Sequence, residues 1–287
     1  MSMQTIQYTG YSDLTLVADI GGDKHNPPVI LLHGGGQTRH SWRRLGRTLI
    51  DSGYQVINLD MRGHGDSAYS LEGDYSLDAF IEDLKAVVNT LDHPPVLIGA
   101  SLGGAVSLLA CGESLALCAR ALILVDVVPR MSLQGVDNIR QFMASTLIGF
   151  TTLEEAASAI AKYSPVRTKP ASTEGLLKVL KLRADGRYYW HWDPAFLNDE
   201  SRSVSAPFTH RMETAASAIG IPTLLIRGAE SDVVTQDGAQ SLLNLIPHAQ
   251  LQDVSGAGHM VGGDKNDPFN QVILNFLATA LPALGER

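Results

Sequence analysis

The sequence contains little that would point to export, to a metal site or to a disulfide framework. Only two cysteines occur among its 287 residues, Cys111 and Cys118. We expect both to be small buried side chains in a reducing compartment rather than a disulfide or a metal site. Residues 1–13 show no basic segment followed by an apolar stretch, so no secretory signal is predicted. We therefore expect a cytoplasmic protein that holds no metal.

The sequence also lacks a long uninterrupted apolar run and an excess of basic charge. Its most apolar stretch, residues 105–128, is interrupted by Glu113, Arg120 and Asp126. Such a segment does not suit the hydrocarbon core of a bilayer. A formal net charge of -8 argues against a large basic surface for phosphate backbones or anionic lipids. We expect a small-molecule partner, no nucleic acid and no membrane, and a monomer or homodimer.

Short segments rich in Val, Ile and Leu alternate with longer segments of helical periodicity. This alternation predicts a mostly parallel sheet with helices on both faces. The expected strands of that sheet are residues 27–34, 54–61, 94–101, 121–128, 221–228 and 249–256, and the expected helices between them are residues 41–53, 76–91 and 102–117. Residues 5–10 and 14–22 alternate apolar and polar positions, which indicates an antiparallel hairpin at the sheet edge.

The alternation stops between residues 131 and 217. Helical patterns cover 133–145, 152–164 and 172–184, and an aromatic segment follows at 187–197. The sequence therefore predicts a core domain of residues 1–130 and 218–287 with a helical cap, residues 131–217, inserted into it. We expect Trp190 and Trp192 to form an apolar pocket wall, although packing between cap helices explains them equally well.

One serine lies between an expected strand and an expected helix. Gly99, Ser101 and Gly103 spell GxSxG at this junction, the context typical of a nucleophile elbow. A serine in such a sharp turn has an exposed hydroxyl at strained dihedral angles, so the neighbours two positions away must be very small. The N-terminus of the following helix directs N–H groups toward the place where an oxyanion would form. Ser101 is the candidate nucleophile.

A serine nucleophile needs a base and a group that orients that base. His259 lies in a glycine-rich loop directly after the last expected strand, so it is the candidate base. Asp232 follows the expected strand that ends at Gly228, and we predict that it is the acid. Glu230 on the same loop and Asp126 after an earlier strand remain alternatives. The chain order Ser, Asp, His is that of one class of hydrolases.

The oxyanion donors are sought in the glycines after the first expected parallel strand, which follow His33. We predict that the backbone amides of Gly35 and Leu102 donate. Gly36, Met260 and the two tryptophans are expected to contact substrate. The absence of GxxxxGK[ST] and of a GxGxxG that opens a βαβ unit argues against the alternative of a phosphate-binding loop.

A second polar loop, residues 59–67, ends another expected strand at the same edge. Arg62, His64 and Asp66 in this loop are expected to form a hydrogen-bonded support for the site rather than a second catalytic dyad.

Together these motifs resemble the α/β-hydrolase superfamily. The resemblance rests on the segments 33–36, 60–65 and 99–104, on Asp232 and on residues 258–260, in family order over nearly the whole chain. It implies an eight-stranded sheet, a Ser-His-Asp triad and acyl transfer to water without a cofactor. Serine at position 101 argues against epoxide hydrolases and haloalkane dehalogenases, which carry Asp there. The surrounding sequence is similar to capped carboxylesterases and to cofactor-free haloperoxidases.

The function predicted from sequence is a carboxylesterase that cleaves esters of small or medium acyl size through an acyl-enzyme. A carbon–carbon bond hydrolase, a lactonase and a perhydrolase or haloperoxidase are alternatives on the same triad. A binding protein that keeps the triad and uses the cap as its binding surface is the alternative without catalysis.

Overall fold

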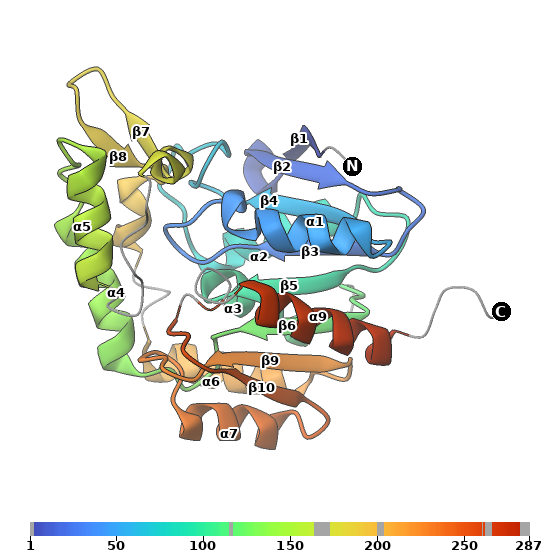
Figure 1. Ribbon diagram of the computed structural model, residues 1–287. Helices are drawn as coiled ribbons and strands as arrows, with labels where there is room; N and C mark the ends of the chain where they lie inside the picture. The colour runs from blue at the N-terminus through green and yellow to red at the C-terminus, as the bar shows by residue number, and fades with distance from the viewer. Residues whose placement is uncertain are drawn as a thin grey trace.

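The computed structural model describes residues 3–114, 117–163, 173–199, 204–259, 261 and 266–281. Its centre is an eight-stranded sheet with the strand order β1-β2-β4-β3-β5-β6-β9-β10 (Figure 1). The strands are β1 (Gln4–Thr9), β2 (Thr15–Gly21), β3 (Pro28–Leu32), β4 (Gln55–Asp60), β5 (Val96–Ala100), β6 (Ala121–Val125), β9 (Thr223–Gly228) and β10 (Gln250–Val254). The predicted fold class, a mostly parallel α/β sheet with helices on both faces, is confirmed.

The pairing within the sheet follows the two periodicities seen in the sequence. The alternating segments form the antiparallel pair β1 and β2, and β2 pairs antiparallel with β4. The remaining neighbours pair in parallel. All five residues of β3 and of β6 are buried, because helices cover both faces of a parallel sheet. The carboxyl ends of β3, β5 and β6 therefore lie side by side at one edge.

Helices cover the sheet in two layers (Figure 1). On one face α1 (Arg43–Asp51) packs beside α9 (Asn266–Ala280) over a buried cluster from β3, β5, β6 and β9. The other face is covered by α2 (Leu77–Val88), α3 (Leu102–Glu113), α6 (Ala206–Ser217) and α7 (Gln236–Leu245). The two short 3-10 segments of the N-terminal half are η1 (Tyr11–Asp13) and η2 (Arg39–Trp42). Helix α2 begins where the Ser76 hydroxyl accepts a hydrogen bond from the Ala79 amide, a common N-cap.

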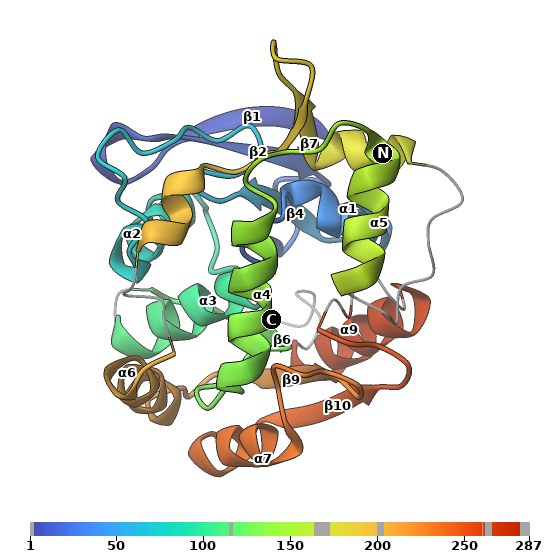
Figure 2. The same cartoon turned by 90° about the vertical axis from the view of Figure 1, so that its left-hand side faces the viewer.

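The segment between β6 and α6 lies over one end of the sheet (Figures 1 and 2). It contains α4 (Leu133–Ser145), α5 (Leu153–Tyr163), η3 (Glu174–Lys178), β7 (Leu180–Leu182), β8 (Tyr188–Trp190) and η4 (Pro194–Asn198). The helix predicted over 172–184 is wrong in its second half. Leu180 pairs with Trp190 and Leu182 pairs with Tyr188 in an antiparallel ladder, so a short strand replaces the expected helix there. Residues 164–172 lie outside the described part of the chain.

The predicted cap range includes one helix that belongs to the core layers. Helix α6 packs against α3, and its Phe208, Met212 and Ala216 belong to the large buried cluster under the sheet. This helix follows the cap in the chain but covers the sheet, so the layer that it joins cannot be read from its periodicity. Helix α6 therefore packs with the core helices although it lies within the predicted cap range of 131–217.

Both cysteines are free thiols. Cys111 is half-buried rather than fully buried, and desolvation raises the pKa of its thiol to about 12. Cys118 is exposed, so the expectation of burial is wrong for it. Over the described stretches of chain, no helix has the length and apolar character needed to cross a membrane.

The placement of α6 predicts a large stability effect at Met212. This side chain is fully buried, so Met212→Ala leaves a cavity beneath the sheet and lowers the free energy of unfolding by about 2–5 kcal/mol. Urea denaturation measures the change. The control is His210→Ala on the exposed side of the same helix, for which a change within about 0.5 kcal/mol is expected. Equal effects of the two substitutions would show that α6 does not stabilise the core.

Candidate active site

Ser101 lies in a strained turn between β5 and α3. Its backbone has φ 46° and ψ -113°, a conformation that residues other than glycine rarely adopt. The Ser101 amide donates to the Val125 carbonyl at 3.0 Å, and the Gly103 amide donates to the His33 carbonyl at 3.2 Å. These bonds from both sides of the turn hold a conformation that a free chain would leave.

The glycines around Ser101 are required by close backbone contacts. A Cβ at Gly99 would lie 2.3 Å from the Gly103 carbonyl oxygen, and a Cβ at Gly103 would lie 2.4 Å from that of Leu32. Both distances are well below van der Waals contact, and both involve backbone atoms that cannot move aside. The GxSxG pattern is therefore the steric condition for passing from β5 into α3 with a serine at the corner.

The structure pairs His259 with Asp126 and not with Asp232. The His259 Nδ1 lies 2.7 Å from the Asp126 Oδ2, and the Asp126 side chain is completely buried. Asp232 is exposed on the loop after β9, as is Glu230. The prediction of Asp232 as the orienting acid is thus corrected. It assumed that the acid follows β9, whereas the partner of His259 follows β6, the neighbouring strand.

Asp126 is held for this contact by two further donors. The Gly228 amide donates to its Oδ1 at 3.0 Å, and the Ser231 hydroxyl donates to its Oδ2 at 2.5 Å. The residue itself has φ 51°, a strained value for a side chain other than glycine. A buried carboxylate with three donors stays oriented, because each bond also offsets part of the cost of desolvation. The sequence offered one signal, an aspartate directly after a buried strand.

The hydrogen-bond partners in the glycine loop, residues 34–36, show which amides there are left open. The Gly34 amide donates to Gln37 Oε1 at 3.3 Å, and the Gly36 amide donates to His64 Nε2 at 3.0 Å. Among the described residues, the amides of Gly35 and Leu102 have no hydrogen-bond partner, and both residues line the same cavity as Ser101. The two amides predicted to donate are therefore the ones left open in this loop and at the start of α3.

Two neutral histidines connect this loop to the loop after β4. His33 Nε2 accepts from the Met61 amide at 3.0 Å, so Nδ1 carries the proton and donates to the Gly34 carbonyl at 2.8 Å. His64 Nε2 accepts from the Gly36 amide, and its Nδ1 donates to the Arg62 carbonyl at 2.9 Å. The two rings lie 5.1 Å apart, and both are buried. Each imidazole thus fixes the position of the glycine loop only in its neutral form.

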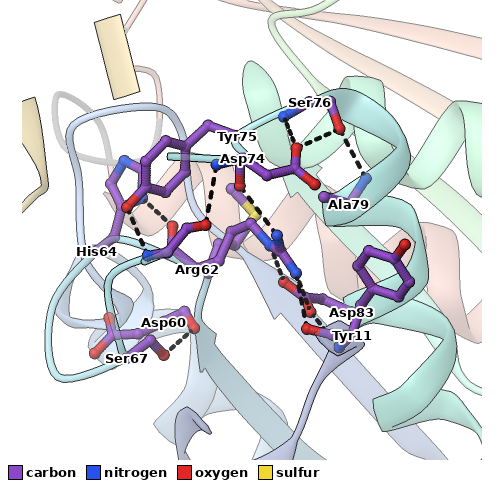
Figure 3. Close-up of polar contacts among 12 residues, drawn as sticks. Tyr11, Asp60, Arg62, His64, Ser67, Asp74, Tyr75, Ser76, Ala79 and Asp83 are labelled. Atoms are coloured by element: carbon purple, nitrogen blue, oxygen red, sulfur yellow. Dashed lines mark hydrogen bonds and ion pairs between the residues drawn. The ribbon is translucent and has the colours of Figure 1, made fainter. Parts of the chain in front are cut away.

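The loop after β4 is itself anchored by ion pairs, of which Figure 3 shows the pair of Arg62 with Asp83. Arg62 Nε contacts Asp83 Oδ2 at 2.6 Å, with both side chains almost fully buried. Asp66 contacts Arg39, whose guanidinium also contacts Asp60. The expected support by Arg62, His64 and Asp66 exists, but the three side chains reach separate partners. Of these three, only His64 reaches the glycine loop.

Ser101 and His259 open into one cavity of about 440 Å³. Gly36, Trp190 and Trp192 line it, while their contact with substrate stays a prediction, and Met260 lies outside the described residues. Trp192 is buried, and the Trp190 indole N–H donates to the Thr146 hydroxyl at 2.9 Å. The two tryptophans therefore serve both as cavity wall and as packing within the cap. Cap residues that the sequence did not single out also line the cavity, among them Val136, Ile139, Arg140, Phe142, Met143 and Phe196.

The buried state of His33 predicts a loss of stability in acid. Removal from water lowers its pKa below the ordinary value of 6.5, against a smaller opposite effect of Asp60. The unfolded chain therefore binds more protons as the pH falls below about 6.5, which favours unfolding. We expect His33→Gln to flatten the decline of the unfolding free energy below that pH, by at most about 1.4 kcal/mol per pH unit.

Urea denaturation between pH 5 and pH 8 measures this slope. The matched control is His25→Gln in an exposed turn, which should keep the slope of the unmodified protein. Parallel stability curves for His33→Gln and the unmodified protein would contradict the assignment of a buried neutral imidazole.

Comparison with known proteins gives the chain a family. Residues 27–265 match the family described as alpha/beta hydrolase fold. The chain is 27% identical over 273 residues to the sn-1-specific diacylglycerol lipase ABHD11 of Mus musculus, covering 90% of this chain and 83% of that protein. It is 26% identical over 269 residues to an esterase of Mycobacterium tuberculosis, covering 88% of this chain and 83% of that one.

A solved structure agrees with the fold. The crystal structure of E-2-(acetamidomethylene)succinate hydrolase superposes with a TM-score of 0.84 at 21% identity, over 96% of this chain and 99% of that one. This likeness concerns the fold alone. The family match, together with the lipase and esterase relatives, supports hydrolase activity. The strained serine, the buried acid and the open amides lie in a chain that belongs to the alpha/beta hydrolase fold family.

Proposed function

We propose that this protein hydrolyses carboxylic esters of small or medium acyl size, with Ser101 as nucleophile, His259 as general base and Asp126 as the acid that orients the base. The observation that carries the proposal is the contact of His259 Nδ1 with the buried carboxylate of Asp126, beside a strained serine on the same cavity. That contact fixes one imidazole nitrogen and leaves Nε2 to exchange protons.

In the first half of the reaction the Ser101 Oγ attacks the ester carbonyl carbon, and its proton passes to His259 Nε2. The carbonyl oxygen becomes an oxyanion. The amides of Gly35 and Leu102 stabilise this charge, since they have no other partner among the described residues. The imidazolium is stabilised by the Asp126 carboxylate. When the carbon–oxygen bond breaks, His259 returns the proton to the departing alcohol.

In the second half, water attacks the acyl-enzyme. His259 removes one proton from this water, the oxyanion forms again at the same amides, and the acid leaves as Ser101 recovers its proton. The acyl group occupies a cavity whose described lining is mainly apolar and aromatic and whose volume of about 440 Å³ suits a small or medium chain. The carbon–carbon hydrolase, lactonase and perhydrolase alternatives stay predictions, as do the cytoplasmic location and the monomer or homodimer.

The nucleophile is tested by Ser101→Ala. This change removes the only atom that can form the acyl-enzyme in the scheme, so kcat for 4-nitrophenyl butyrate should fall on the order of 10⁴- to 10⁶-fold. Circular dichroism and urea denaturation serve as controls for folding. A serine-directed phosphonate should label Ser101 in the unmodified protein, as mass spectrometry of the adduct would show. Near-normal hydrolysis by Ser101→Ala would rule out the scheme.

The acid is tested by comparing Asp126→Asn with Asp232→Asn. In Asp126→Asn the neutral side-chain amide no longer stabilises the His259 imidazolium, and it favours the wrong tautomer of the His259 ring. We therefore expect kcat/KM to fall by roughly 10³- to 10⁴-fold. Asp232 is exposed and has no contact with His259, so Asp232→Asn should keep kcat/KM near the unmodified value. A larger loss of kcat/KM in Asp232→Asn than in Asp126→Asn would show that Asp232 is the acid.

A further inference from the structure

Helix α4 of the cap crosses the candidate active site from one loop to the other (Figure 2). Near its start, Gly135 packs directly against the backbone of the loop after β9. A Cβ added to this glycine would lie only 2.3 Å from the Asp232 carbonyl oxygen. Near its end, the Met143 side chain packs against the glycine loop. A Cβ added to Gly36 would lie 3.0 Å from the Met143 methyl carbon. Ser101 and His259 lie on the cavity that α4 covers.

The inward face of α4 carries one cation among apolar side chains. Val136, Ile139, Arg140 and Met143 all line the cavity, at the spacing of three and four that places side chains on one helix face. Gln134, Asp137 and Gln141 on the opposite face are exposed. Arg140 lies between the two loops that α4 touches. At about 1.5 Å of rise per residue it is roughly one turn from Met143 along the axis.

Arg140 has no anionic partner among the residues that the structure describes. The buried guanidinium groups of Arg39, Arg62 and Arg227, by contrast, each contact a carboxylate. Asp199 also lines the cavity, but no ion pair joins it to Arg140, and it has a contact of its own. A substrate that covers the half-buried Arg140 guanidinium removes water from it. This desolvation costs free energy unless the substrate itself carries a hydrogen-bond acceptor for the guanidinium.

We propose that Arg140 binds a carboxylate carried by the substrate, so that the preferred esters are half-esters of dicarboxylic acids with a short apolar spacer. This inference rests on the proposed ester hydrolysis and names its substrate class. The apolar side chains around Arg140 take the methylene spacer, and the guanidinium forms paired hydrogen bonds with the terminal carboxylate. Lys178, exposed at the same cavity, adds a second positive charge that attracts such an anion.

The test compares two esters of equal chain length, mono-4-nitrophenyl adipate and 4-nitrophenyl hexanoate, which differ only in the terminal carboxylate or methyl group. We expect the unmodified protein to prefer the adipate ester in kcat/KM. Arg140→Gln should lower the ratio of the two kcat/KM values by about 10- to 100-fold, as expected for the loss of a charge-assisted hydrogen-bond pair. Arg140→Lys, which keeps the charge, should restore part of the ratio.

Arg47→Gln is the matched control, because Arg47 is an exposed arginine on α1, outside the cavity. It should leave the ratio unchanged. Hydrolysis of hexanoate with no preference for adipate, or an unchanged ratio in Arg140→Gln, overturns the inference and leaves the proposed function standing. If Arg47→Gln lowers the adipate-to-hexanoate ratio of kcat/KM as much as Arg140→Gln does, the inference about Arg140 is also overturned.

A binding measurement separates this inference from the reaction itself. Calorimetric titration of the Ser101→Ala protein with monomethyl adipate and with methyl hexanoate requires no turnover. We expect tighter binding of the anionic ester and a 10- to 100-fold loss of that binding when Arg140→Gln is added. If the unmodified protein hydrolyses neither ester, the proposed function fails, and equal binding of the two ligands then overturns the role of Arg140.

Discussion

The rest of the site depends on the buried carboxylate of Asp126. It accepts hydrogen bonds from the Gly228 amide, the Ser231 hydroxyl and His259 Nδ1, and so ties the end of β6 to the loops after β9 and β10. Burying a carboxylate away from water is costly unless such donors replace its hydration. The same group of bonds also fixes the orientation of the His259 imidazole.

On the other side of the cavity, the glycine loop depends on histidines that must stay neutral. His33 and His64 each accept a backbone N–H and donate to a backbone carbonyl, so they act as rigid connectors rather than as acids or bases. Because His64 engages the Gly36 amide, the Gly35 amide is the one that remains open. The arrangement engages both nitrogens of each loop histidine with the backbone, which is consistent with the proposed choice of His259 as the general base.

In the proposed function, the segment between β6 and α6 adds selectivity to the chemistry of the core. Helix α4 contacts the loop after β9 and the glycine loop, and residues of both loops line the same cavity as Ser101, so the inward face of α4 is turned to that cavity. That face is apolar except for Arg140. A pocket wall of this kind selects by differences in desolvation, since it accepts methylene groups readily and a buried charge only opposite the guanidinium.

The sequence by itself determined the parallel sheet, the edge hairpin and the turn at Ser101. Strand periodicity and the steric demand for glycine at positions 99 and 103 are local properties of the chain. It could not determine that Asp126 rather than Asp232 meets His259, that β7 forms within the cap, or that α6 covers the sheet. Those outcomes depend on which strand ends and helix faces meet in space, and several spacings along the chain satisfy the same local pattern. Only the tertiary structure brings Arg140 over the cavity, because the path of α4 is set by the loops at its two ends.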